Sequence, residues 1–591
     1  MKLDNKIATA LLNLAKKNNV IVFILFVFLA LCYGYYSSID MGIPPDEFAH
    51  MGYIYDVVKN GFPNYSAGFI YETDKYNYLP HPALYYFITG NIAKLYHLFD
   101  VYSTRPLRII NILTSMGTLL VIYAALNKMG IRKSSIFLAL IILLCIPMFI
   151  LLSASINNDT LMIFGCALVT YSLVLYYYHA TTRKVIGYLL LGCVITALSK
   201  ATGALSMVCM ISVFIIIQNV KLKKFIFNLK ILDFFLIIFS ISCVAIYFLI
   251  VYKHFGKLFP APQGDPSDWF LVMKPNMPRM NIYENIAAFA YSNVFSLTSP
   301  YGYKHFNDLP LRVSLLKLCM ASLPIFTITS CLILRREKSL QWQIPFIFLI
   351  SFSLFTLFYF LTVRGMHLKT GYTGAMQARY FFGFLPAAII IYALAIDQLK
   401  IRVLEFLIAI IFITTLALSF YPAYISLFPS YYGQDTADTP YIELTSSENF
   451  EQNFISEYNT LSRVDLFLGT YRRVNTSDIT LQIIDNKNKT VASKKINAAT
   501  IEDNSWVSFI FNGEKLNIGD IYKLRLTSTN SSQGNAITWA TYLSNTRDPH
   551  YYGTPYGPPI ILGDRYNNGI ALSNGKKMDF VFVFKIYKKS H

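Results

Sequence analysis

Long apolar runs recur along the first 425 residues of this chain and constrain its fold more than any other feature. A helix of about 20 mainly apolar residues is long enough to cross a bilayer. The chain is 54% hydrophobic and 14% charged, with a mean hydropathy of +0.44, which is typical of a polytopic membrane protein. We predict eleven membrane spans, at about residues 20–36, 107–126, 135–152, 160–178, 185–199, 203–219, 231–252, 312–334, 344–363, 381–397 and 403–425.

The charges in the connecting loops predict the orientation of these spans. Short cytoplasmic loops of membrane proteins are rich in Lys and Arg, and here such residues gather in every second loop. They are Lys128, Arg132, Lys133, Arg183, Lys184, Lys221, Lys223, Lys224, Lys230, Arg335, Arg336, Lys338, Lys400 and Arg402. We therefore predict a cytoplasmic N-terminus and, because the number of spans is odd, an extracytoplasmic C-terminus. Three outer loops follow, at about 37–107, 253–311 and 364–380.

The net charge of +18 does not indicate a nucleic-acid partner. From Ser430 onward the chain has 17 Lys and Arg against 16 Asp and Glu, which leaves 34 against 17 in the membrane part. Nucleic-acid binding calls for a folded basic domain, and this distribution shows none. We expect membrane lipids as partners, and no nucleic acid.

The last 160 residues follow a different pattern, in which apolar and polar residues alternate. Alternation with period two predicts strands with one buried face. The alternating segments are 478–485, 506–512, 521–529, 536–543 and 579–587. We predict a catalytic membrane domain at 1–429 and an extracytoplasmic, jelly-roll-like β-sandwich at 430–591. Its aromatic residues Trp506, Trp539 and Tyr542 are candidates for sugar binding, although core packing is the more common role of such residues.

The first outer loop is expected to contain two helices that lie along the membrane surface. Pro45 suits the first turn of a helix. Apolar residues then recur at spacings of three, four and three, from Phe48 to Val58, and give that helix an apolar stripe. A second apolar helix is expected from His81 to about Phe99.

The motif PPDEFAH, at Pro44–His50, places two acids just beyond the first span. Acids at the outer membrane face, followed by LPHPALYY at residues 79–86, suggest chemistry on a lipid-linked substrate. If that chemistry is sugar transfer from a lipid phosphate, the leaving group is already a stable anion, so one carboxylate acting as a base suffices. Asp46 is our candidate for that base. Four residues on, His50 shares its helix face and could orient the carboxylate or the sugar, while Glu47 faces elsewhere. Asp46 equally fits an acid that stabilises the first turn of a helix.

Several cations in the outer segments are candidates for holding the donor phosphate. The segment RGMHLKTGYTGAMQARY carries Arg364, Lys369 and Arg379 in what should be a short outer loop, where Lys and Arg are normally scarce. Arg grips phosphate oxygens with two donors, and Lys supplies a point charge. Lys200 in ALSKATG is a further candidate. The alternative role for all four is contact with lipid headgroups.

Three further residues are candidates for substrate binding. Asp159, in SASINNDT, fits both an acid at the start of a helix and a functional acid at the membrane edge. His81 and Tyr85 lie in LPHPALYY, where His81 better fits a helix-start residue than a ligand. Asp46, His50 and His81 could together bind a divalent metal, but three residues without known geometry are weak evidence for one.

Taken in order, PPDEFAH, LPHPALYYFITG, RPLRIINILTS, SINNDTLM, ALSKATG and MQARYFFGFLP resemble the multi-pass membrane glycosyltransferases of the C-type (GT-C) fold. The resemblance covers about residues 1–425, with Phe48 where many relatives have proline. It implies a polyprenyl-phosphate-linked sugar donor and an extracytoplasmic acceptor. It also implies that Asp46 is the base, that Glu47 assists it and that Arg379 contacts the phosphate.

These observations predict an inverting transferase in the plasma (inner) membrane of a bacterium. Its acceptor would be a glycan or lipid-linked glycan of the cell surface, such as lipopolysaccharide or teichoic acid. Two alternatives remain, a transporter or flippase of lipid-linked sugars and a polymerase or ligase of whole glycans. Transporters commonly carry internal repeats and charges at mid-membrane, and we find neither in this sequence.

Overall fold

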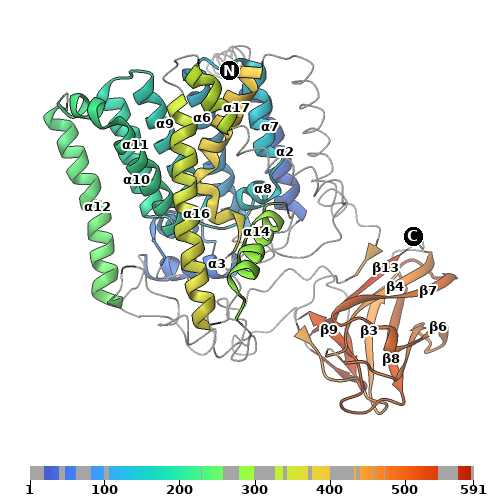
Figure 1. The fold of residues 1–591 in the computed structure, drawn as a ribbon. Helices are drawn as coiled ribbons and strands as arrows, with labels where there is room; N and C mark the ends of the chain where they lie inside the picture. The colour runs from blue at the N-terminus through green and yellow to red at the C-terminus, as the bar shows by residue number, and fades with distance from the viewer. Residues whose placement is uncertain are drawn as a thin grey trace, which may run out of the picture. The chain divides into compact units, whose positions relative to one another are not determined.

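Seven helices in the described part of the chain are long and apolar enough to cross a membrane, and a bent helix pair raises the number to eight. A chain with this many spans is a multi-pass membrane protein, as the apolar runs predict. Six of them are α2 (Asn19–Ser38), α6 (Arg108–Lys128), α9 (Asp159–Tyr177), α11 (Ala201–Phe227), α12 (Ile231–Phe255) and α16 (Gln343–Thr370) (Figure 1). The seventh, Ala378–Gln398, combines the short helix η4 (Ala378–Phe384) with α17 (Leu385–Leu399).

The chain divides into two compact units, one within residues 1–427 and the other formed from 428–552 and 559–591. The predicted boundary at residues 429 and 430 stays a prediction, because it lies outside the described residues. The computed structural model describes residues 19–38, 47–61, 81–98, 105–227, 229–256, 258, 279–298, 327–336, 342–370, 376–399, 431–433, 439–456, 459–471, 473–542, 570–578 and 580–587.

The span predicted at 135–152 is broken. It consists of α7 (Lys133–Leu144) and α8 (Pro147–Ser153), which are bent by 74° relative to one another. Pro147 occupies the first turn of α8, and Ile146 before it is extended. Proline lacks an N–H donor and disfavours a helical residue before it, so the helix ends and restarts there.

Of three other predicted spans, one is too short for a full crossing, one is only partly described and one lies outside the described residues. The span at 185–199 corresponds to α10 (Thr182–Ala197), whose 16 residues are short for a crossing. Within 312–334 only residues from 327 are described, and they are helical. The span at 403–425 lies outside the described residues, so the total of eleven stays a prediction.

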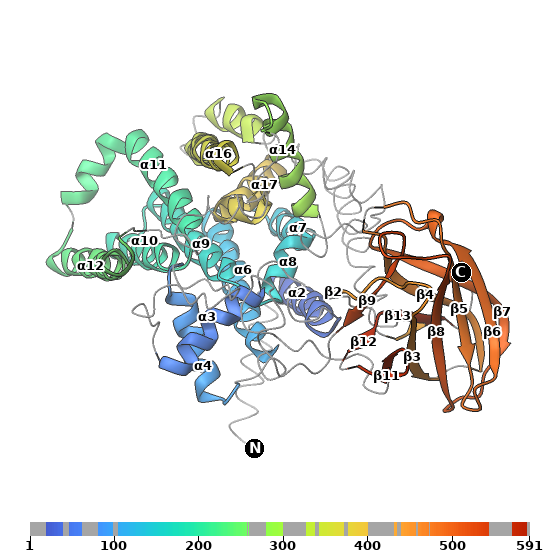
Figure 2. The same cartoon turned by 90° about the horizontal axis from the view of Figure 1, so that it is seen from below.

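Two short helices occupy the positions predicted for the first outer loop, α3 (Glu47–Asn60) and α4 (Leu84–Leu95). They pack against each other, as Figure 2 shows, and α3 lies at one end of the helical unit in Figure 1. The rings of Tyr53 and Tyr86 stack with centroids 3.9 Å apart. A Cβ atom at Gly90 would lie only 2.6 Å from Val57, so only glycine permits this close approach.

Packing in the helical unit centres on α7, α8 and α17, whose side chains are almost all buried. They form one apolar cluster with the inner faces of α2, α6 and α9. The short helix η4 (Ala378–Phe384) leads into α17 and contacts α9, α11 and α14 (Ile282–Thr298). These contacts bring the starts of several helices together at one end of the unit.

The second unit contains two antiparallel sheets, which confirms the predicted C-terminal all-β domain. One sheet has seven strands: five follow the order β1-β13-β4-β9-β12, β2 pairs with β9 and β7 pairs with β4. The other sheet has the order β11-β10-β3-β8-β5-β6. The strands are β1 (Tyr431–Tyr432), β2 (Thr439–Pro440), β3 (Asn449–Ile455), β4 (Thr460–Gly469), β5 (Asp478–Ile484), β6 (Thr490–Asn497), β7 (Ser505–Lys515), β8 (Ile521–Thr529), β9 (Thr538–Tyr542), β10 (Ala571–Ser573), β11 (Lys576–Lys577), β12 (Val581–Phe582) and β13 (Phe584–Tyr587).

Trp539 fills the core of this unit and is not available to a ligand. Its side chain is fully buried, stacks on Phe582 and donates its indole N–H to the carbonyl oxygen of Val583 at 2.8 Å. Trp506 lies outside that core, with the ammonium group of Lys585 3.9 Å from its ring centroid. The side chain of Tyr542 is outside the described part of the unit.

Candidate active site

Glu47 begins α3 and forms a buried ion pair with Arg108 at the start of α6. Arg108 donates from Nε to Glu47 Oε1 at 2.9 Å and from a terminal nitrogen to Oε2 at 2.8 Å. The backbone N–H of Ile156 donates to Oε1 at 2.8 Å. Both side chains have no exposed surface. The carboxylate therefore joins α3, α6 and the turn between α8 and α9.

That turn, residues 154–158, is held in place by amide side chains. Asn111, one helical turn beyond Arg108, donates to the carbonyl oxygens of Ser155 and Asn157. Asn157 Oδ1 in turn accepts the backbone N–H groups of Asp159 and Thr160 at 3.0 and 3.3 Å. Such side-chain acceptors satisfy the free N–H groups at a helix start, so the turn fixes where α9 begins.

Asp159, the first residue of α9, lies against two cations. Lys200 Nζ donates to Asp159 Oδ1 at 2.6 Å, and Arg379 lies 3.7 Å from Oδ2. Both cations also lie over the ring of Tyr380, each 5.2 Å from its centroid. All three charged side chains are at least nine-tenths buried. Residues from α9, the α10–α11 junction and η4 thus converge on one point.

His50 and Tyr86 form a second polar contact beside this end of the bundle. His50 Nδ1 and the Tyr86 hydroxyl share a hydrogen bond of 2.7 Å, and both residues are buried. Tyr85 is also buried and packs edge-on against Tyr86. His81 contributes its backbone, since its carbonyl oxygen accepts hydrogen bonds from Tyr53 and Tyr247.

The predicted outer loop at 364–380 begins later than expected, because α16 continues to Thr370. Arg364 donates to the carbonyl oxygen of Met280 at 2.7 Å, and His367 Nε2 accepts the N–H of Met280 at 2.9 Å. These bonds tie the end of α16 to the segment before α14. Lys369 is exposed, and its carbonyl oxygen accepts a bond from Arg279. Arg364 and Lys369 therefore lie in the last turns of α16, whereas Arg379 lies beside the carboxylate of Asp159.

Asp46 and the preceding PP dipeptide lie outside the described residues, and Glu47 is the first described residue after them. Among the residue ranges that are described, no group of three or more His, Cys, Asp and Glu side chains has the arrangement of a metal site. The predicted set of Asp46, His50 and His81 stays a prediction, because it includes Asp46.

Arg108 and Asn111 are site residues that sequence reasoning missed. A signal was present: Arg108, Asn111, Ser115 and Thr118 are spaced three, four and three residues apart within an apolar helix. That spacing puts all four on one face, and all four are buried. Polar side chains in a membrane span commonly face the bundle interior and mark function.

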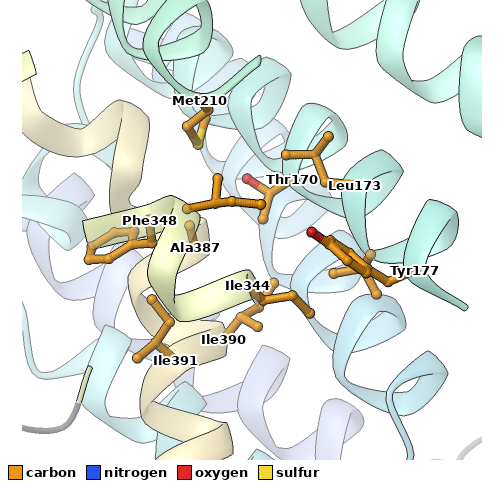
Figure 3. A pocket seen from close by; sticks show the side chains of 11 residues that line it. Thr170, Leu173, Tyr177, Met210, Ile344, Phe348, Ala387, Ile390 and Ile391 are labelled. Carbon is orange, nitrogen blue, oxygen red and sulfur yellow. The ribbon is translucent and has the colours of Figure 1, made fainter. Parts of the chain in front are cut away.

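A small cavity lies farther along the helices and has a different character. It is lined by apolar side chains of α9, α11, α16 and α17, including Leu173, Met210, Phe348 and Ile391, with Thr170 and Tyr177 as its polar members (Figure 3). None of the predicted site residues lines it.

Fold and site together define a polytopic membrane protein with buried charged residues gathered at one end of its helices and an all-β domain. Residues 80–244, which include α4 through most of α12, match the profile of a family described as dolichyl-phosphate-mannose-protein mannosyltransferase. The match confirms the resemblance to multi-pass membrane glycosyltransferases. It contains Arg108, Asp159 and Lys200, and it ends before Arg379.

Two solved structures are similar to this chain, both of ArnT from Cupriavidus metallidurans. The match to the apo structure has 15% sequence identity and a TM-score of 0.41, and it covers 65% of this chain and 61% of the ArnT chain. The structure bound to undecaprenyl phosphate has 15% identity and a TM-score of 0.40, and covers 64% and 60%. The chain therefore spans about 61% of the length of that relative. No curated protein matches the sequence.

Proposed function

We propose that this chain transfers a sugar from a polyprenyl-phosphate donor to an extracytoplasmic acceptor, with inversion at the sugar. The acceptor would be a cell-surface glycan, and the enzyme would work at the outer face of a bacterial plasma membrane. The observation that carries the proposal is the convergence of Lys200 and Arg379 on Asp159 at the end of the bundle where α3 begins. The family matched by residues 80–244 is named for a lipid-phosphate sugar donor.

Two cations in one buried cluster favour an anionic ligand. Lys200 and Arg379 both lie against Asp159, and Lys and Arg bind phosphate oxygens through charge-assisted hydrogen bonds. The phosphate of a lipid-linked donor would bind here, with Lys200 and Arg379 as its partners and with Arg364 and Lys369 as further candidates.

In the proposed reaction, the hydroxyl oxygen of the acceptor attacks the anomeric carbon of the donor sugar, and Asp46 takes the proton of that hydroxyl. The bond from that carbon to the phosphate oxygen breaks on the opposite face, so the configuration inverts. The electron pair leaves with the polyprenyl phosphate, whose charge Lys200 and Arg379 stabilise. His50 would orient Asp46 or the sugar, and Asp159, His81 and Tyr85 would help to bind substrate.

The proposal is tested by the mass of the surface glycan in a strain that lacks the gene. Loss of one hexose or pentose per modified site, restored by the wild-type gene, is the expected result. An unchanged glycan, combined with no turnover of polyprenyl-phosphate sugars by the purified protein, would contradict it. Movement of the lipid-linked sugar across a vesicle membrane without transfer would favour the transporter alternative.

A further inference from the structure

We propose that Glu47 and Arg108 are a positioning pair, which fixes the start of α3 to the turn before Asp159 and takes no direct part in the reaction. The inference rests on the proposed function, because it concerns the geometry of the same site. It assigns a role to Arg108, and it separates the two adjacent acids of the PPDEFAH motif into a base and an anchor.

The contacts of Glu47 are those of an anchor. Oε1 accepts two hydrogen bonds, from Arg108 Nε and the Ile156 backbone, and Oε2 accepts one from the other arm of the guanidinium. Neither side chain is exposed. A general base has to come within about 2.6–3.2 Å of the proton it removes, and a carboxylate enclosed by three donors is poorly placed for that.

The same contacts join the segments that carry the other acids. The peptide bond before Glu47 links it directly to Asp46, and Ile156 is three residues from Asp159. Asn111 also holds this turn, by donating to the carbonyl oxygen of Asn157. Asn158 donates to the carbonyl oxygen of Ser199, next to Lys200, at 2.8 Å. The Glu47–Arg108 pair is therefore the point at which α3 is fixed to the turn that carries the Asp159 cluster.

Stability alone does not account for a pair of this kind. Replacing both members of a buried ion pair with apolar residues of similar size is often neutral or stabilising. A bidentate pair does, however, fix distance and angle more tightly than apolar contacts. Displacing a reacting group by about 1 Å can lower a rate about 100-fold, so the pair's contribution should be found in the rate.

Two variants of the full-length protein test the proposal, with polyprenyl-phosphate sugar as the substrate and surface glycan as the acceptor. In Glu47→Gln we expect kcat to fall about 100-fold, with little change in the donor KM. The fall of kcat/KM at acid pH, which reports the base of the free enzyme, should persist in this variant. Loss of that acid limb would identify Glu47 as the base and overturn the proposal.

The double variant Glu47→Leu/Arg108→Met guards against a variant that merely fails to fold, because it buries no unpaired charge. We expect it to be folded and to lose as much kcat as Glu47→Gln, since the single and the double change remove the same interaction. Wild-type kcat in the folded double variant would overturn the proposal. Asp397→Asn is the control, because it alters the ion pair between α17 and Arg132, the residue before α7, and should leave kcat unchanged.

Failure of the proposed function is distinguishable from failure of this inference. If the wild-type protein transfers no sugar, the proposed function itself is wrong. If the wild type is active and Glu47→Gln is as active as the wild type, only the positioning role is wrong.

Discussion

Asp159 and Lys200, 41 residues apart in the chain, form a buried ion pair of 2.6 Å, and Arg379 approaches the same carboxylate. Each of the three lies at a helix end: the start of α9, the α10–α11 junction and the short helix η4. Charged side chains in a membrane bundle commonly face its interior and mark a functional site. The pair therefore marks the end of the bundle at which chemistry on an anionic substrate is possible.

Neutralising either cation should weaken the use of the donor. Hydrogen bonds to charged groups are worth about 1.5–3 kcal/mol, so we expect kcat/KM for the donor to fall about 10- to 100-fold in Lys200→Met and in Arg379→Gln. Lys59→Gln, an exposed residue of α3, is the control and should behave as the wild type. Steady-state kinetics with a polyprenyl-phosphate sugar measure the effect, and unaltered kinetics in both variants would contradict a phosphate-binding role.

Replacing Asp159 should affect stability and lipid binding in opposite directions. Asp159→Asn leaves the two buried cations without their shared carboxylate, and breaking a buried pair costs about 3–5 kcal/mol. We expect a lower Tm for the variant in detergent. Added polyprenyl phosphate should raise that Tm by more than it raises the Tm of the wild type, because its phosphate replaces the missing charge. An equal or smaller shift would argue against a phosphate beside these cations.

The contact between α9 and α10 should not tolerate a side chain at Gly192. A Cβ atom at Gly192 would lie 2.6 Å from the carbonyl oxygen of Gly165. Overpacking of this kind costs about 1–3 kcal/mol, so Gly192→Ala should lower the Tm. Gly187 lies in the same helix and has open space around its Cβ position, so Gly187→Ala should not. Equal effects of the two substitutions would show that the close approach is absent.

The β-domain should contain an acid-sensitive loop contact. Partial burial raises the pKa of Glu443, but hydrogen bonds from Arg473 and the Gly534 N–H, with the charge of Arg473, outweigh that effect and lower it. A lowered pKa in the folded state stabilises the fold at neutral pH, and this contribution is lost as the pH falls through that lowered pKa.

Glu443→Gln tests that contact by hydrogen exchange of the segment around Gly534 in the full-length protein. At pH 7 this segment should exchange faster in the variant than in the wild type. The difference should disappear below the lowered pKa of Glu443. A difference that stays constant with pH would contradict an ionised Glu443 as its cause.

Much of the architecture could be predicted because it follows from the periodicity of apolar residues. The span at 20–36 is α2, and the alternating segments of the last domain are strands β5, β7, β8, β9, β12 and β13. The sequence also carried the cause of the break in 135–152, since Pro147 lies in the middle of that run. Strands β3, β4 and β6 were missed, because Asn, Gln, Lys and Ser interrupt or replace their apolar positions.

The site was less predictable, because its contacts join residues far apart in the chain. Arg379 and Lys200 could be proposed from their unusual positions, but nothing local indicates that both reach Asp159. Arg364 looks equivalent to Arg379 in sequence. Its guanidinium instead bonds the backbone of Met280, because α16 extends beyond its apolar run and meets the segment before α14.

The central claim is that Asp46 removes the proton from the acceptor, and Asp46→Asn tests it most directly. Asparagine keeps the size of the side chain and cannot act as a base at neutral pH. Sugar transfer by the purified full-length protein should fall at least about 1,000-fold, at the upper part of the range for general base catalysis, while binding of polyprenyl phosphate is retained. Asp56→Asn, ten residues further along the chain in α3, should remain active. Wild-type transfer by Asp46→Asn would contradict the account.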